Sequence, residues 1–213
     1  MGALALADKQ AVDKLAELGL TVEIIERVVR RADAEASMCT ALDPPIMEGL
    51  TRWARTTRFL REELIPQGWR FDNPRSLPRT IHPSGEFAIV ASTGDELTGL
   101  LDAVPATKYP KGDATVRAVE INEQLTLDLG DFDLLEGDDA GEILTWLLMY
   151  HASEDEFRVE LSLPDEIVDG RITSWAVRII LPAFPHDEDR LTWPVAPAGD
   201  EPDDSFVVEV TRR

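Results

Sequence analysis

A short apolar run, Phe87–Ala91, divides the chain into two parts of different character. Turn-forming residues bound it on both sides, with Pro83-Ser84-Gly85 before it and Thr93-Gly94-Asp95 after it. This pattern is typical of a buried strand that enters a tight loop. Helical periodicity dominates the chain before this run, whereas strand-like stretches and turn residues dominate after it. The sequence therefore predicts an α+β fold.

Three helices are predicted within residues 1–66. The first spans Asp8–Leu18, and the second follows Thr21, whose hydroxyl can cap its first turn. The third begins near Asp43 and ends at Pro66. Amphipathic helices joined by short connections pack as a bundle. Residues 1–66 are therefore expected to form a three-helix bundle that packs on the rest of the chain.

Residues 67–213 are expected to form an α+β domain, with a mainly antiparallel sheet crossed by one buried helix. Mixed, alternating character over Thr115–Leu129 predicts a strand. The nearly continuous apolar stretch within Ala140–His151 predicts the buried helix. The clearest strands are Glu156–Leu163 and Arg171–Leu181, which should pair as an antiparallel hairpin with one face on the core.

Acidic residues outnumber basic ones by 41 to 21, which gives a formal net charge of −20. Residues 131–213 contain 21 of the acidic residues and only 6 of the basic ones. Such a surface repels nucleic acid and anionic membranes and attracts basic partners or cations. Four explanations compete: solubility or a generally acidic proteome, a patch for a basic protein partner, mimicry of a nucleic acid, and a cation site. The candidate partner surface comprises Asp187, Glu188, Asp189, Asp200, Glu201, Asp203 and Asp204.

The sequence TGDELTG, Thr93–Gly99, is the most site-like motif. Its glycines permit close approach of a ligand, and its hydroxyl and carboxylate groups could bind one. The same residue types also form strand-to-turn connections that bind nothing. Two lysines follow in the sequence KYPKG, so if this domain binds an anion, its site should lie between these two loops. The candidate ligand residues are Thr93, Gly94, Asp95, Thr98, Lys108 and Lys111.

No metal or cofactor is predicted. Acidic residues approach the spacing of a calcium-binding loop, but a leucine stands at one ligand position and the turn glycine is displaced. An acidic start to a helix explains the same residues, because the helix dipole favours negative charge there. The three histidines lack the spacing of zinc ligands. The calcium-like residues are Asp131, Asp133, Asp139 and Glu142.

Arginines recur every three residues along the predicted third helix, at Arg52, Arg55, Arg58 and Arg61. This spacing winds around a helix of about 3.6 residues per turn, so the arginines do not share one face. Ion pairing with this protein's own acids is favoured over a strip that binds phosphate, and no direct nucleic-acid binding is expected. A single cysteine and no signal peptide or membrane-length apolar segment predict a cytoplasmic protein.

The sequence thus predicts a non-enzymatic accessory protein that binds a basic protein partner, with mimicry of a nucleic acid as the sharper form of this hypothesis. The alternative is a hydrolase or transferase with a site near Thr93–Gly99. That alternative requires Asp95, His82 and Lys108 to converge on one pocket.

Overall fold

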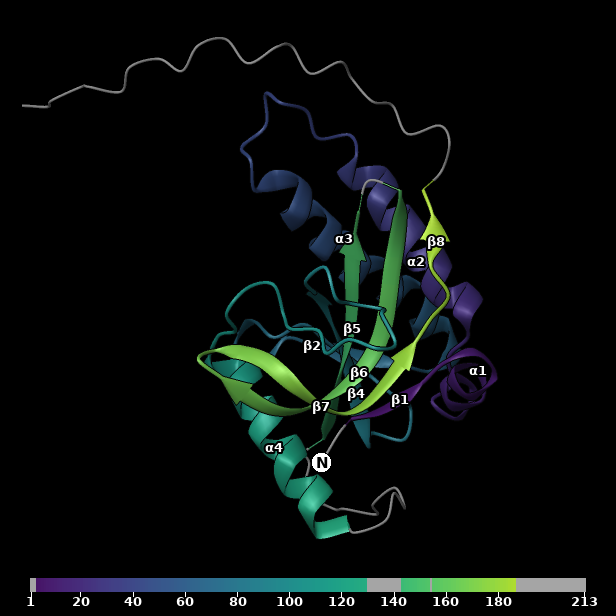
Figure 1. The fold of residues 1–213 in the computed structure, drawn as a ribbon, viewed down its shortest axis with the longest axis vertical. Coiled ribbons are helices and arrows are strands. Elements are labelled where there is room, and N and C mark those ends of the chain that lie inside the picture. Colours follow the sequence, from purple (N-terminus) through teal and green to yellow (C-terminus); the bar gives the residue numbers. More distant parts are fainter. Residues whose placement is uncertain (1–2, 130–142, 154, 187–213) are drawn as a thin grey trace, which may run out of the picture.

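The computed structural model describes residues 3–129, 143–153 and 155–186 (Figure 1). Within these residues, a mixed eight-stranded sheet has the order β1-β7-β6-β5-β4-β3-β2, and β8 pairs with β6. The neighbours β4 and β5 are parallel, as are β1 and β7, whereas the other pairs are antiparallel. The strands are β1 (Leu4–Leu6), β2 (Arg70–Asp72), β3 (Arg79–Ile81), β4 (Phe87–Thr93), β5 (Leu144–Ala152), β6 (Glu156–Val168), β7 (Arg171–Ile180) and β8 (Phe184–Pro185).

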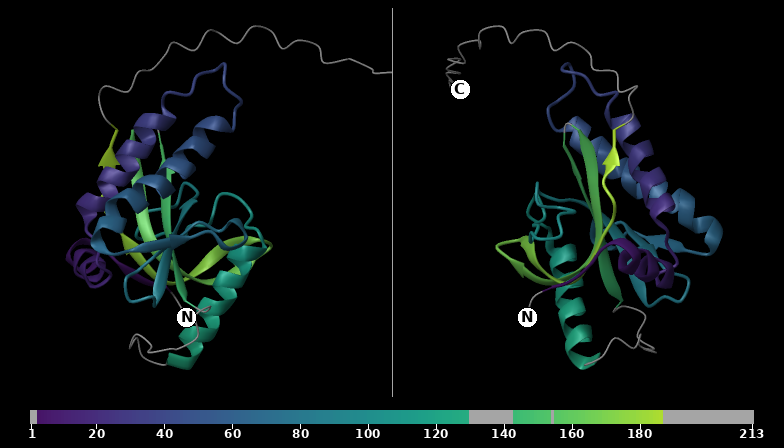
Figure 2. Two further views of the ribbon diagram at one scale, coloured as in Figure 1. Left: turned by 180° about the vertical axis from the view of Figure 1, so that it is seen from behind. Right: turned by 45° about the vertical axis from the view of Figure 1, so that its right-hand side comes forward.

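Helices lie on both faces of this sheet (Figure 2). On one face, Leu15, Ile25 and Leu60 share a core with the inward side chains of the central strands. On the other face, Val119 of α4 joins a second cluster that includes Met149. The helices are α1 (Asp8–Glu17), α2 (Val22–Ala36), α3 (Met47–Leu64) and α4 (Asp113–Leu129), with short 3-10 turns at Ile65–Gln67 and Pro74–Ser76.

The helices predicted before residue 66 are confirmed as elements, but a three-helix bundle is not. The Thr21 hydroxyl accepts a hydrogen bond from the backbone N–H of Ile24 at 3.3 Å, which is the predicted cap of α2. Helices α2 and α3 pack against each other, whereas α1 packs beside β7. The reason is β1, which pairs in parallel with β7 and brings α1 to that edge of the sheet. The boundary at residue 66 stays a prediction.

Two predicted elements of the second part are wrong in type. Thr115–Leu129 lies in helix α4 rather than in a strand, and Leu144–Ala152 is strand β5 rather than part of a helix. Parallel strands require a long crossover connection, and α4 lies in the connection from β4 to β5. The apolar run of β5 is continuous because both faces of this strand are covered, and such a run has the same pattern as a buried helix.

The predicted strands around residues 87–91, 156–163 and 171–181 are confirmed as β4, β6 and β7. Strands β6 and β7 form the predicted antiparallel hairpin. The sheet is mixed, with the parallel pairs β1–β7 and β4–β5 among antiparallel ones, and the helix that packs across it is α4. The calcium-like residues 131–142 lie outside the described residues, as do the candidate partner residues 187–204.

Candidate functional site

The TGDELTG motif begins a compact loop, residues 94–107, whose two ends meet. Gly94 and Thr107 form an isolated β-bridge. The backbone N–H of Lys108 donates to the carbonyl of Thr93 at 3.0 Å, which closes the loop at the end of β4. Short, closed loops of this kind are often functional. The structure thus brings the TGDELTG segment next to the KYPKG segment.

Most polar groups of the motif serve this loop's own structure. The Asp95 carboxylate accepts hydrogen bonds from the backbone N–H groups of Leu97 at 3.1 Å and Ala106 at 2.9 Å. The Thr98 side chain is fully buried, and a Cβ added at Gly94 would lie 2.0 Å from its Oγ1. Gly94 is therefore required by close packing against Thr98, which is a structural reason for a glycine here.

A buried ion pair holds the loop against the sheet. Glu160 of β6 and Arg178 of β7 pair at 2.6 Å, with side chains 0% and 2% exposed. The Glu160 carboxylate accepts from the N–H of Gly99 at 2.9 Å, and the Arg178 guanidinium donates to the carbonyls of Leu100 and Ala103. The predicted outward face of this hairpin is thus covered. A search for opposite charges on paired strands could have suggested the Glu160–Arg178 pair, but not the loop that covers it.

Lys111, one of the predicted ligand residues, has a largely buried amine with a shifted pKa. Its ammonium group donates to Ser92 Oγ at 2.7 Å, and no carboxylate of the described residues lies within ion-pair distance. Burial lowers the pKa of Lys111 to about 8. Lys108, by contrast, is exposed and lies over the ring of Tyr109. The two lysines therefore do not offer equivalent charges to a ligand.

The carboxyl ends of the parallel strands β4 and β5 place further polar groups near this loop. Thr93 Oγ1 donates to the Tyr150 hydroxyl at 3.2 Å, and burial raises the pKa of Tyr150. The pKa of His151 is lowered, first by burial and then by the positive charges of Arg158 and Lys108. Thr93, Tyr150 and His151 therefore place polar side chains beside the 94–107 loop.

His82 does not join the groups at the end of β4. It stacks on Phe87, the first residue of β4, with ring centroids 4.6 Å apart. Asp95 follows the other end of the same seven-residue strand, about 20 Å away at the usual rise per residue. Asp95, His82 and Lys108 therefore do not converge on one pocket.

The arginines of α3 bind within the molecule. Arg52 pairs with Asp33 at 2.9 Å and with Glu48 at 2.6 Å. Arg55 pairs with Glu35, and Arg58 pairs with Glu62. Arg61 instead donates to the backbone carbonyls of Asp72 and Arg79 and to Asn73. The prediction of internal pairing is confirmed for the first three, although Arg52 is buried rather than solvated.

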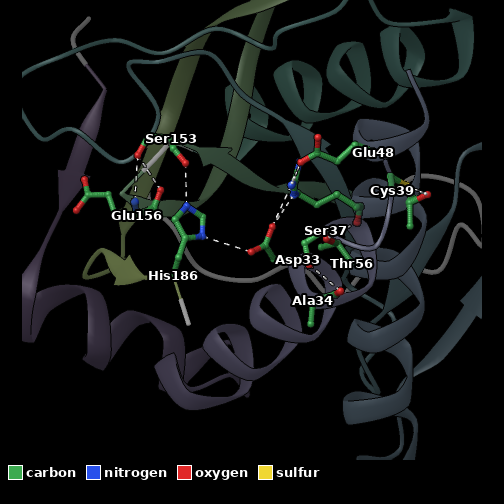
Figure 3. Close-up of polar contacts among 11 residues, drawn as sticks. Asp33, Ala34, Ser37, Cys39, Glu48, Thr56, Ser153, Glu156 and His186 are labelled. Atoms are coloured by element: carbon green, nitrogen blue, oxygen red, sulfur yellow. Dashed lines mark hydrogen bonds and ion pairs between the residues drawn. The ribbon is translucent and has the colours of Figure 1, made fainter. Parts of the chain in front are cut away.

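A polar network links α2 and α3 to the last described residue, His186 (Figure 3). Asp33 accepts from Arg52 through Oδ1, and His186 Nδ1 lies 3.3 Å from Asp33 Oδ2. The other ring nitrogen of His186 lies 2.8 Å from the carbonyl of Ser153. Nothing in the sequence pattern near His186 predicted this contact. It joins His186 to α2 and to the end of β5.

A cavity of about 620 Å³ lies between the Pro74–Ser76 turn and the start of α4. Arg75 and Arg117 line it from opposite elements, together with Asp113. This lining is not the acidic surface predicted from the sequence.

Metal-ligating residues do not gather anywhere in the described part of the chain: no group of three or more histidine, cysteine, aspartate or glutamate residues could hold an ion there. No helix among the described residues is long and apolar enough to cross a membrane. Comparisons of the chain with protein-family models, curated proteins and solved structures find no match.

Proposed function

We propose that this chain is a non-enzymatic accessory protein that binds a basic protein partner through the acidic residues of its last third. The observation that carries this proposal is the charge distribution, with 21 acidic and 6 basic residues over 131–213. In its sharper form, the partner is a nucleic-acid-binding protein and the acidic surface mimics phosphates. Long-range attraction of this kind accelerates association and weakens with added salt.

Internal charge pairing supports the proposal. Several arginines of α2 pair with carboxylates of α3, as in Arg27–Glu63 and Arg31–Glu62, so their positive charges are used within the layer formed by α2 and α3. The helical layer therefore presents little unpaired positive charge to attract nucleic acid. His186, which directly precedes the candidate surface in the sequence, contacts Asp33 of α2.

The internal contacts of the TGDELTG loop argue for binding over catalysis. Asp95 is engaged by two backbone N–H groups, so its carboxylate is not placed as a general base. Among the described residues, Lys111 favours the enzyme alternative, since an amine that has a lowered pKa and no carboxylate partner there can act as a nucleophile.

A synthetic lysine–leucine peptide that folds as an amphipathic helix can stand in for the basic partner. Its affinity for the full chain should fall steeply between about 50 and 300 mM salt. The test variant carries amide replacements of the candidate surface, at Asp187, Glu188, Asp189, Asp200, Glu201, Asp203 and Asp204. A matched control carries seven amide replacements in the amino-terminal part and in α4, at Asp8, Asp13, Glu17, Glu23, Asp43, Asp113 and Glu123.

The proposal predicts that the carboxy-terminal variant binds the peptide at least about tenfold more weakly than the control variant, although both lose the same charge. Equal affinities for the two variants would show that net charge alone attracts the peptide. Binding that does not respond to salt would also contradict the proposal.

A further inference from the structure

The 94–107 loop exposes apolar side chains on a rigidly held backbone. Leu97, Leu100, Leu101 and Val104 are 38%, 39%, 52% and 62% exposed, within eight consecutive residues. Two exposed acidic residues, Glu96 and Asp102, lie among them in the sequence. Exposed apolar side chains that gather in one place commonly mark an interaction surface.

The support beneath this loop is a fully buried ion pair. The Glu160–Arg178 pair binds Gly99, Leu100 and Ala103 through their backbone groups. Removing two charges from water is costly, so a buried pair contributes specificity of structure more readily than stability. Here the structure that it specifies is the backbone that displays the exposed leucines.

Two further buried contacts fix the far end of the loop. The indole N–H of Trp175 donates to the carbonyl of Pro105 at 2.8 Å. Thr107 exchanges hydrogen bonds with Ile172, at 3.0 Å through its backbone N–H and at 3.2 Å through its hydroxyl. A loop ordered before binding loses little conformational entropy when a partner arrives, which favours affinity.

A second exposed apolar group lies in the connection between α2 and α3. Met38, Leu42 and Ile46 are 76%, 97% and 71% exposed. Local contacts, such as the hydrogen bond from the Thr40 N–H to Asp43 at 2.8 Å, hold this connection. Among the residues that the structure describes, no buried ion pair binds the backbone of this connection, so we favour the 94–107 loop and use the connection as the control.

We propose that the 94–107 loop is a docking surface for an amphipathic segment of a basic protein. Apolar side chains of that segment contact Leu97, Leu100, Leu101 and Val104, while its lysines or arginines face Glu96 and Asp102. The net charge of −20 favours a positively charged segment over an acidic one. This inference rests on the proposed function, since it names where the partner makes its apolar contacts.

The lysine–leucine peptide tests the inference with the full-length protein. The loop variant is Leu101→Ser with Val104→Ser, and the control variant is Met38→Ser with Leu42→Ser. All four side chains are at least half exposed, so both variants should melt at the wild-type temperature. We expect the loop variant to bind about tenfold or more weakly than wild type and the control variant to bind as wild type does.

A second peptide has serine in place of leucine and the same charge. It distinguishes apolar contact with the loop from electrostatic attraction to the protein. It should bind weakly and equally to wild type and to the loop variant. If the lysine–leucine peptide binds in a salt-dependent manner but the loop variant binds it as tightly as wild type, the docking surface is refuted and the proposed function stands. Equal weakening by the control variant also refutes it. Failure of both peptides to bind at low salt contradicts the proposed function itself.

Discussion

Replacement of Arg178 by methionine should strongly destabilise the protein. The Arg178 guanidinium contacts both oxygens of Glu160, at 3.2 and 2.6 Å, and donates to two carbonyls of the 94–107 loop. Methionine fills similar volume but leaves the Glu160 carboxylate buried without a cation. Removing one partner of a buried pair costs about 3–5 kcal/mol, a large share of the roughly 5–15 kcal/mol that stabilises a typical domain.

Urea denaturation followed by tryptophan fluorescence measures this cost, since Trp175 lies beneath the loop and binds Pro105. The double variant Arg178→Met with Glu160→Leu removes both charges, so it should be more stable than Arg178→Met alone. A cost below about 1 kcal/mol for Arg178→Met would refute the assignment of a buried, mutually dependent pair. A double variant less stable than Arg178→Met would refute it too.

Three further predictions concern single side chains. Lys111→Met should stabilise the protein by about 1–2 kcal/mol at pH 7, because the folded chain holds this ammonium group at a lowered pKa. Between about pH 8 and 10.5, Lys111 keeps its proton in the unfolded state but loses it in the folded state, so the wild-type free energy of unfolding should rise with pH. The difference in free energy of unfolding between Lys111→Met and wild type should therefore shrink across that range. A difference that does not shrink would contradict the burial of the amine. Gly94→Ala should lower the free energy of unfolding, measured by urea denaturation, by about 1–3 kcal/mol, because the added methyl group would collide with Thr98. The control is Gly49→Ala in α3, where the methyl group would meet no atom within 4 Å and should stabilise the helix slightly. Equal effects of the two substitutions would contradict the close packing at Gly94. Asn122→Ala should cost about 3 kcal/mol in thermal unfolding, because the Asn122 amide bonds both backbone groups of Thr145 and joins α4 to β5, and a shift in melting temperature near zero would contradict this role.

Secondary structure was predicted correctly where a helix or strand buries one face and was expected to expose the other. Helix α2 could be placed from its cap and apolar stripe, and the hairpin of β6 and β7 from its alternation. The strand β5 and helix α4 were exchanged in type because a strand covered on both faces lacks alternation, whereas β-branched residues gave α4 a strand-like composition. In both cases the three-dimensional packing, rather than the local preference, decides the structure.

The candidate site was predicted only in part. The sequence named the TGDELTG and KYPKG segments as the place to look for a bound anion, and the two segments lie side by side at the end of β4. The support beneath the loop was not predicted, because Glu160 and Arg178 stood on the hairpin face expected to be solvated. Their burial depends on a loop about 60 to 80 residues away in the sequence, and alternation within a strand carries no information about such a cover.

Carbodiimide cross-linking tests the central claim most directly, because it joins lysines of the bound lysine–leucine peptide to the carboxylates that they contact. After digestion, mass spectrometry identifies the acidic residues that became linked. We predict linkage to the acidic residues between Asp187 and Asp204, with additional linkage to Glu96 and Asp102 of the loop. Linkage spread evenly over the chain, or concentrated at Asp8, Asp13 and Glu17 of α1, would contradict recognition of a basic partner by the last third of the chain.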